Sequence, residues 1–354
     1  MKLNALQGGR AIAALMVVVF HANVVILPER IFKDGTQAWS GFNMGYAGVE
    51  FFFVLSGFIM VYIHQRDFDK PDRAWRFMRK RVTRIYPVYW VILAALVMLY
   101  NLVPSRGPET AREASAVLAA FALVPEGRAP ILEVAWTLQF EMFFYLIFAG
   151  MILAFRPGVW LFVIWMAMCF AGLFIDFENM PWRFLFSPYN IVFLTGILAA
   201  LGYHRLPEHA AVPLILIGLL VFFATGLSEA VGTMIWHTGL RTVIYGLSAG
   251  AVVAGLARTA EQTNRKTPKS FVFLGDASYS IYLVHVPAMS LASLIFVEMG
   301  ITSLPPLPVL IGAVVFGTIA GIAVHLTIER PFMLYFQRNN RAPKHSNIPH
   351  SKKP

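Results

Sequence analysis

Charged residues are scarce in this sequence. Aspartate, glutamate, lysine and arginine make up 14% of its 354 residues, whereas soluble domains carry about 25%. Hydrophobic residues make up 58%, and the mean hydropathy is +0.64. No soluble core could bury this much apolar surface. The composition therefore excludes an ordinary soluble domain and indicates a chain that lies in lipid.

Cysteine is almost absent. The single residue, Cys169, lies inside an apolar run, so the chain has no intramolecular disulfide and no cysteine cluster for a metal. The net charge is +10, but the basic residues occupy short loops between apolar runs, which is the positive-inside pattern of membrane proteins. We therefore expect no nucleic acid and no metal. The sequence also lacks a P-loop, a dinucleotide fingerprint and internal repeats.

Apolar segments recur along the whole chain. A helix needs roughly 20 mostly apolar residues to cross the hydrocarbon core, and on this basis the sequence predicts an all-α polytopic membrane protein with about ten transmembrane helices. The expected spans are 10–27, 45–63, 84–102, 136–154, 158–175, 189–203, 210–227, 240–257, 276–297 and 307–328. The first lacks a clean cleavage site, so we expect a retained helix rather than a signal peptide. A shorter stretch, Ala114–Val124, fits a surface helix or a re-entrant segment.

The distribution of lysine and arginine predicts the orientation. With ten crossings and the N-terminus inside, the inward segments hold 22 basic residues and the outward segments hold 7. This excess predicts that both termini are cytoplasmic and that the number of spans is even. The polar, basic C-terminal tail is expected to be disordered on the cytoplasmic face.

Ionisable residues inside membrane helices cost several kcal/mol unless they are paired or hydrated. Arg10 and His21 are eleven residues apart in the first span, which places them about 16 Å apart along a helix axis and close to the same face. Arg10 is either a snorkelling anchor or a functional cation. His21 is either a packed polar residue or a catalytic group, and an imidazole at this depth favours function.

A basic segment precedes the third span. Residues 76–84 contain five basic residues in nine at helical spacing. The segment is compatible with ordinary positive-inside flanking. It is equally compatible with a cradle for phosphates, because arginine presents a planar, bidentate donor.

Glu141 and Tyr145 are four residues apart in the fourth span and face the same way. The carboxylate of Glu141 can orient the imidazole of His21 or act as a base itself. The alternative is a hydrogen-bonded pair that only packs two helices together.

Ser278, Tyr282 and His285 form a second polar stripe, which serves either interhelical hydrogen bonds or substrate contact. Glu50 can cap the second helix near its N-terminus. Glu329 either ends the last helix or pairs with an arginine opposite. Together these residues predict one intramembrane site with a basic cytoplasmic mouth and a deeper imidazole. Acyl-CoA, with a phosphorylated head and a long thin arm, has the matching shape.

Six segments in order carry a resemblance to a known family: Leu6-Gln-Gly-Gly-Arg10 with His21, Gly48-Val-Glu-Phe-Phe-Phe-Val-Leu-Ser-Gly-Phe58, Arg81-Val-Thr-Arg84-Ile-Tyr-Pro87, Trp136-Thr-Leu-Gln-Phe-Glu141, Leu274-Gly-Asp-Ala-Ser-Tyr-Ser-Ile-Tyr-Leu-Val-His285 and Glu329-Arg-Pro331. The chain resembles the acyltransferase-3 family of membrane O-acyltransferases over about residues 3–335. It is most similar to the branch that acetylates exopolysaccharides of the succinoglycan type. Gln7-Gly8-Gly9 and Thr137 depart from the usual family pattern.

This resemblance implies a transmembrane acyltransferase domain over residues 1–335, followed by the tail 336–354. It implies a bacterial inner-membrane enzyme in contact with membrane lipids, with acetyl-CoA as the usual acyl donor. The acceptor would be a hydroxyl of an exported or cell-surface polysaccharide, or of its lipid-linked oligosaccharide precursor. The resemblance implies that His21 and Glu141 are catalytic. It implies that Arg10, Arg81 and Arg84 bind the CoA phosphates. It also implies that Tyr145, Tyr282 and His285 contact the substrate.

Two other classes of protein compete with the enzyme hypothesis. A secondary transporter or flippase for a glycan precursor also carries intramembrane charges, although the sequence has no inverted repeat and no matched pair of broken helices. A scaffold subunit of a polysaccharide-export complex would use the charges for assembly only.

The substitution His21→Ala separates these classes. An acyltransferase should lose modification of the exported polysaccharide while still folding, because the base is removed. The measurement is the O-acyl signal in proton NMR of the polysaccharide, in a deletion strain complemented at matched membrane abundance. Full restoration by the variant would indicate that His21 is structural.

Overall fold

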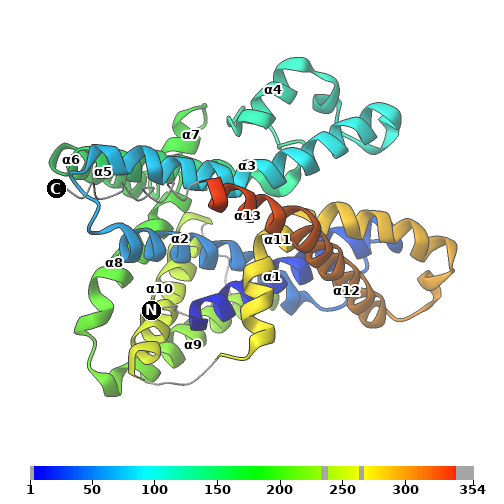
Figure 1. Ribbon diagram of the computed structural model, residues 1–354. Coiled ribbons are helices and arrows are strands. Elements are labelled where there is room, and N and C mark those ends of the chain that lie inside the picture. Colours follow the sequence, from blue (N-terminus) through cyan, green and yellow to red (C-terminus); the bar gives the residue numbers. More distant parts are fainter. Residues whose placement is uncertain (1–3, 233–237, 263–266, 340–354) are drawn as a thin grey trace, which may run out of the picture.

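The computed structural model describes residues 4–232, 238–262 and 267–339, and these ranges contain helices and no strands (Figure 1). The longer helices have these bounds: α1 Asn4–His21, α2 Gly48–His64, α3 Pro71–Leu102, α4 Ala114–Ala122, α5 Trp136–Leu153, α6 Phe155–Ala171, α8 Tyr189–Gly202, α9 Ala211–Ala230, α10 Thr238–Gln262, α11 Lys269–Glu298, α12 Pro306–Val324 and α13 Arg330–Asn339. Shorter elements used below are η1 Ala22–Ile31, η2 Ser40–Ala47, η5 Glu133–Ala135 and η9 His325–Glu329.

The predicted all-α, multi-pass membrane fold is confirmed. Within the described ranges, nine helical segments are long and apolar enough to cross a membrane. The fifth expected span, 158–175, falls mostly on the shorter apolar helix α6, which has 17 residues. The nine are Asn4–Ile31, Ser40–His64, Pro71–Leu102, Glu133–Leu153, Trp182–Arg205, Glu208–Ala230, Thr238–Gln262, Lys269–Glu298 and Pro306–Arg338.

Helix α3 begins well before the expected start at residue 84. Pro71 occupies its first turn together with Asp72, and both residue types favour a helix N-terminus. The segment from there to Arg84 is charged and has no apolar run, so hydropathy alone does not detect it. Arg81 and Arg84 consequently lie inside a continuous helix and not in a loop. The helix fixes the direction in which their side chains point.

Ala114–Val124, which was predicted to be either a surface helix or a re-entrant segment, contains the short helix α4. This helix stands to one side of the main bundle (Figure 1). Side chains of α3 hold its C-terminal end. The Tyr89 hydroxyl donates to the Ala120 carbonyl at 2.6 Å, and the Trp90 indole donates to the Phe121 carbonyl at 2.9 Å. These bonds satisfy carbonyls that the end of a helix leaves free, so α4 is fixed against the C-terminal half of α3.

Glycines let α2 and α8 approach closely near the centre of the bundle. A Cβ atom on Gly196 would lie 2.0 Å from the carbonyl oxygen of Val54, and one on Gly57 would lie 2.2 Å from that of Phe193. Membrane helices commonly use small residues in this way. The contact positions the face of α2 that carries Ser56 toward the site.

The expected boundary at residue 335 falls inside α13, which continues through Asn339. Most of the tail predicted to be disordered, 336–354, therefore lies outside the described residues.

Gly196→Ala should destabilise the protein, because the added methyl group overlaps backbone atoms that cannot move away. Overpacking of this kind costs about 1–3 kcal/mol. The matched control is Gly150→Ala in α5, where a Cβ meets nothing within 4 Å and alanine is the better helix former. The measurement is the thermal midpoint of the purified protein in detergent. Equal midpoints for the two variants would contradict the packing described here.

Candidate active site

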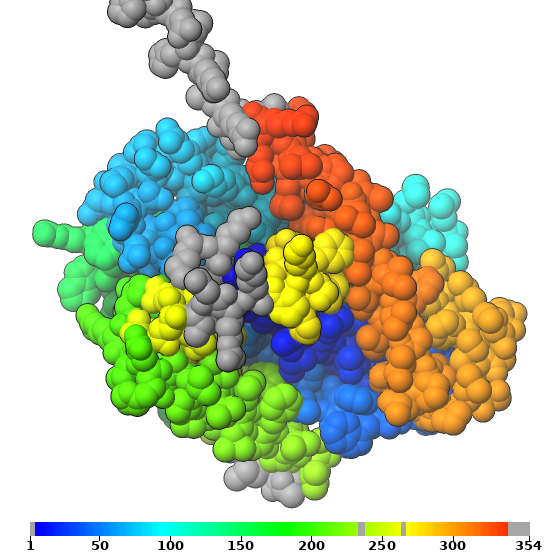
Figure 2. Space-filling model, turned by 60° about the horizontal axis from the view of Figure 1, so that its bottom comes forward, coloured from blue at the N-terminus to red at the C-terminus, as the bar shows by residue number. Residues whose placement is uncertain are grey.

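A cavity of about 560 Å³ lies between α1, α2, α3, α5 and α11, within the usual size range of ligand sites. It is found toward the end of the molecule at which α1 starts. Figure 2 shows this end, with the dark-blue start of α1 between the light-blue start of α3 and the yellow start of α11. Of the predicted site residues, those that line the cavity are Arg10, Arg81, Arg84, Glu141, Tyr145 and Tyr282.

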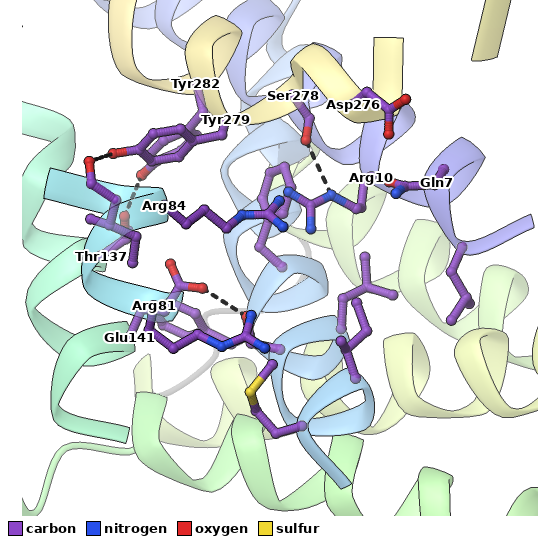
Figure 3. A pocket seen from close by; sticks show the side chains of 18 of the residues that line it. Gln7, Arg10, Arg81, Arg84, Thr137, Glu141, Asp276, Ser278, Tyr279 and Tyr282 are labelled. Atoms are coloured by element: carbon purple, nitrogen blue, oxygen red, sulfur yellow. Dashed lines mark hydrogen bonds between the residues drawn. The ribbon is translucent and has the colours of Figure 1, made fainter. Parts of the chain in front are cut away.

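Three guanidinium groups enter the cavity from α1 and α3 (Figure 3). Arg10 donates from Nε to the Ser278 hydroxyl at 3.2 Å. Arg81 lies 5.4 Å from the ring centroid of Tyr145, and its Nε is buried without an acceptor. Arg84 makes no hydrogen bond to another described residue.

None of these arginines forms a salt bridge with a carboxylate in the described part of the chain. Buried cations are normally paired, since an uncompensated charge away from water costs several kcal/mol. A cavity with three unpaired guanidinium groups is therefore suited to an anion, and phosphate matches their forked donors.

Glu141 lies among the arginines and not beside His21. Its Oε1 accepts hydrogen bonds from the Ser56 hydroxyl at 3.0 Å and from the Tyr145 hydroxyl. The charge of Glu141 acts on Arg10 and Arg81 without direct pairing. In the described residues no hydrogen bond joins Glu141 to His21, so an orienting role toward that imidazole has no contact to support it.

His21 and His285 lie outside the cavity lining and contact each other. The distance from His21 Nδ1 to His285 Nε2 is 3.2 Å, and the ring centroids are 4.9 Å apart. The contacts of Arg10 with Ser278 and of His21 with His285 both face α11. The expectation that Arg10 and His21 share one face of α1 is therefore confirmed.

Backbone carbonyls fix the protonation of this histidine pair. His285 Nδ1 is 2.6 Å from the Tyr282 carbonyl oxygen, which can only accept, so we assign the proton to Nδ1 and a lone pair to Nε2. His21 Nδ1 is 2.9 Å from the Val17 carbonyl oxygen and therefore carries its own proton, which it also shares with His285 Nε2. The remaining nitrogen, His21 Nε2, is then an unprotonated base with no partner among the described residues.

Tyr282 separates the cavity from the histidine pair. Its ring lines the cavity, and its centroid is 5.9 Å from that of His285. Its hydroxyl lies 2.9 Å from Thr137 Oγ1 and donates to the Val134 carbonyl at 3.2 Å. The three residues of the predicted stripe, Ser278, Tyr282 and His285, thus each contact a neighbouring helix or turn at the site.

Asn23 is a residue of the site region that the sequence interpretation missed. It is fully buried, and its Nδ2 donates to the Trp39 carbonyl at 2.9 Å and to Asn43 Oδ1 at 2.8 Å. These bonds hold the η2 loop over the end of α1, directly after His21, where the helix widens into the π-helix η1. The available signal was a polar residue inside an apolar run.

Two further predictions have a clear outcome. Glu50 is buried beside the start of α2 but makes no side-chain capping bond, and both its oxygens lack a partner. Glu329 accepts from Ser280 at 2.7 Å and lies 2.7 Å from His325 Nδ1, whereas no described arginine pairs with it. The described residues contain no group of three potential metal ligands.

The fold and the cavity define a multi-pass membrane protein with an arginine-lined cavity next to a histidine pair. The chain belongs to the acyltransferase-3 family, whose model, described as an acyltransferase domain, matches residues 3–326. It is 31% identical over 313 residues to the exopolysaccharide production protein ExoZ of Rhizobium meliloti (strain 1021), and the alignment covers 86% of this chain and 94% of that protein. No solved structure matches the chain. The predicted family and the enzyme class, an O-acyltransferase, are confirmed.

Thr137→Val should slow acyl transfer about fivefold, because Tyr282 loses a hydrogen bond worth about 1 kcal/mol. Thr137→Ser keeps the hydroxyl and should retain the wild-type rate. The measurement is the initial rate of transfer at saturating donor, for both variants, for Tyr282→Phe and for the double variant Thr137→Val/Tyr282→Phe. Since one bond joins the two side chains, the effects of Thr137→Val and Tyr282→Phe should not add. Full additivity would show that this bond does not matter.

Proposed function

We propose that this protein transfers an acyl group, in the first instance acetyl, from acyl-CoA to a hydroxyl of an exported or cell-surface polysaccharide or of its lipid-linked precursor. We place it in the bacterial inner membrane. The name of the ExoZ relative supports exopolysaccharide as the acceptor class. The observation that carries the proposal is the set of three unpaired arginines in a cavity whose wall residue Tyr282 packs on His285, the partner of His21.

The donor site is argued from charge. CoA carries phosphates on its head, and Arg10, Arg81 and Arg84 offer donors that no carboxylate of the described chain occupies. The buried, unpartnered Nε of Arg81 fits this assignment, because a phosphate oxygen would satisfy it. The narrow pantetheine arm would extend past Tyr282 toward the histidine pair. Glu141 limits the net positive charge and keeps Tyr145 in position beside Arg81.

His21 is the proposed catalytic base. The acceptor hydroxyl oxygen attacks the thioester carbonyl carbon, and His21 Nε2 takes the hydroxyl proton. The C–S bond then breaks, and the proton passes to the leaving sulfur, which yields an ester and free CoA. The same lone pair could instead attack the thioester to give an acyl-histidine before the hydroxyl reacts. Both routes need Nε2 unprotonated, as the hydrogen bonds of His21 Nδ1 require.

His285 acts as a positioning residue in this scheme. Its Nδ1–H is held by the Tyr282 carbonyl, so its Nε2 can only accept. This acceptor retains the proton on His21 Nδ1 and stabilises the ring when it becomes positively charged. Contact of His285 with substrate, as the family resemblance implies, stays a prediction.

The sidedness of the site follows from the charge distribution. Counted with ten crossings, of which the shorter helix α6 is one, the excess of 22 basic residues over 7 supports cytoplasmic termini. Arg10, Arg81 and Arg84 lie toward the end at which α1 starts. Acyl-CoA would therefore enter from the cytoplasm, and the acceptor would meet His21 deeper in the membrane, beyond Tyr282.

Arg84→Gln should weaken CoA binding about tenfold or more, since a hydrogen bond to a charged group is lost. The matched control is Arg79→Gln, an exposed arginine of the same helix outside the cavity, which should bind as the wild type does. The measurement is calorimetric titration of CoA into purified protein in nanodiscs. Equal loss for both variants would contradict a donor site in the cavity.

The overall reaction is tested with acetyl-CoA labelled in the acetyl group. The acceptor is either the cell's own exported polysaccharide, stripped of esters by mild alkali, or membranes that hold the lipid-linked precursor. Label in one of these acceptors, lost again on alkaline treatment, is the expected result. Normal O-acylation together with failed polymer export in a deletion strain would instead favour the transporter.

A further inference from the structure

A third histidine, His64, lies outside the cavity lining but contacts Arg81, which is part of it. His64 is the last residue of α2, and Asp67 lies in the short loop that joins α2 to α3. His64 Nδ1 is 2.8 Å from Asp67 Oδ2, and His64 Nε2 is 3.4 Å from Arg81 Nη2. The imidazole is buried, with 5% of its surface exposed. It therefore bridges an acidic loop residue and an arginine of the donor site.

The direction of both hydrogen bonds is fixed by chemistry. Arginine can only donate, so His64 Nε2 must hold a lone pair. The carboxylate of Asp67 accepts, so His64 Nδ1 carries the proton. Hydrogen bonding from His64 holds the pKa of Asp67 below its usual value, which keeps this loop carboxylate ionised. Asp67, His64 and Arg81 thus form a hydrogen-bonded chain. The bond from His64 Nδ1 to Asp67 leaves His64 Nε2 unprotonated, so that it can accept from Arg81.

We propose that His64 and Asp67 are positioning residues for the donor-binding Arg81. This inference rests on the proposed function, because it assigns Arg81 to the acyl-CoA phosphates. Asp67 selects the tautomer of His64, and His64 holds one terminal nitrogen of the guanidinium. The rings of Phe77 and Tyr145 lie 5.4 Å from the guanidinium carbon. With these groups in place, the buried Nε of Arg81 is left free for an anion.

The loop that carries Asp67 is anchored to another part of the bundle. Asp69 Oδ1 accepts from the Phe155 amide at 2.7 Å, and the Lys70 amide donates to the Ile152 carbonyl at 3.2 Å. Both bonds reach the junction of α5 and α6. Tyr145, which packs on Arg81, also belongs to α5. The anchor therefore fixes Asp67 relative to the cavity, as a positioning role requires.

Protonation of His64 would reverse its effect on Arg81. A proton on Nε2 removes the acceptor and places a second cation against the guanidinium. The charged groups that act on His64 and Asp67 are Arg81, Lys80 and Arg73 of α3 and Lys70 of the loop. Apart from Asp67 itself these groups are cationic, so none of them offsets the repulsion. Donor binding should consequently weaken as the pH falls through the range in which histidine titrates.

The test compares His64→Leu with His64→Gln. Leucine fills the site but cannot accept a hydrogen bond, so the KM for acetyl-CoA should rise about tenfold with kcat within about twofold. The amide oxygen of glutamine can accept from Arg81, so His64→Gln should stay close to the wild-type KM. The wild-type KM should rise when the pH is lowered from about 7 to about 5, and that of His64→Gln should stay level.

The outcomes separate this inference from the proposed function. Equal KM values for the two variants, or the same pH dependence in wild type and His64→Gln, would overturn the positioning role. A wild-type enzyme that never saturates with acetyl-CoA would overturn the donor assignment itself. Thermal midpoints report folding, and if His64→Leu does not fold, the pH arm with His64→Gln decides alone. The exposed His209 supplies the control variant His209→Gln, whose pH profile should match the wild type.

Discussion

The site depends on three arginine side chains that remain charged in a cavity without a carboxylate paired to any of them. The protein compensates two of these cations indirectly. Arg10 is held by a hydroxyl of α11, Arg81 by two aromatic rings and an imidazole, and the charge of Glu141 acts on both. Arg84 is left without such a contact. Placing these cations costs free energy in the folded state, and a bound polyanion would recover it. For this reason the unpaired guanidinium groups are the strongest indication that the acyl donor carries phosphates.

The same helices place the proposed base, His21, away from the three arginines. Helix α11 contributes Ser278 to the arginines, the Tyr282 ring to the cavity wall and His285 to His21. A single helix therefore extends from the arginines of the proposed donor site to His21. Since backbone carbonyls fix the protons on both imidazoles, the free lone pair does not depend on a carboxylate, and Glu141 is available for the arginine end.

The sequence predicted most of this arrangement because its signals are local. Apolar length located the spans, and helical periodicity placed Arg10 with His21 and Tyr145 with Glu141. Relative depth in different helices is not a local property. For that reason the sequence left open whether Glu141 orients His21, acts as a base itself or only pairs two helices. The helical spacing of residues 76–84 indicated a helix ahead of the third span, but its start at Pro71 was not predicted, because a charged helix has no hydropathy signal. His64 and Asp67 were missed because residues at the end of a span resemble ordinary flanking residues until the hairpin brings Arg81 against them.

The most direct measurement of this account separates donor binding from chemistry in one purified variant. His21→Ala should bind CoA with the wild-type dissociation constant, since the imidazole lies outside the arginine cavity, and should transfer no labelled acetyl group to the acceptor. Transfer at the wild-type rate would contradict the assignment of His21 as the base. Loss of CoA binding in a correctly folded His21→Ala protein would contradict the separation of the arginine cavity from the histidine pair.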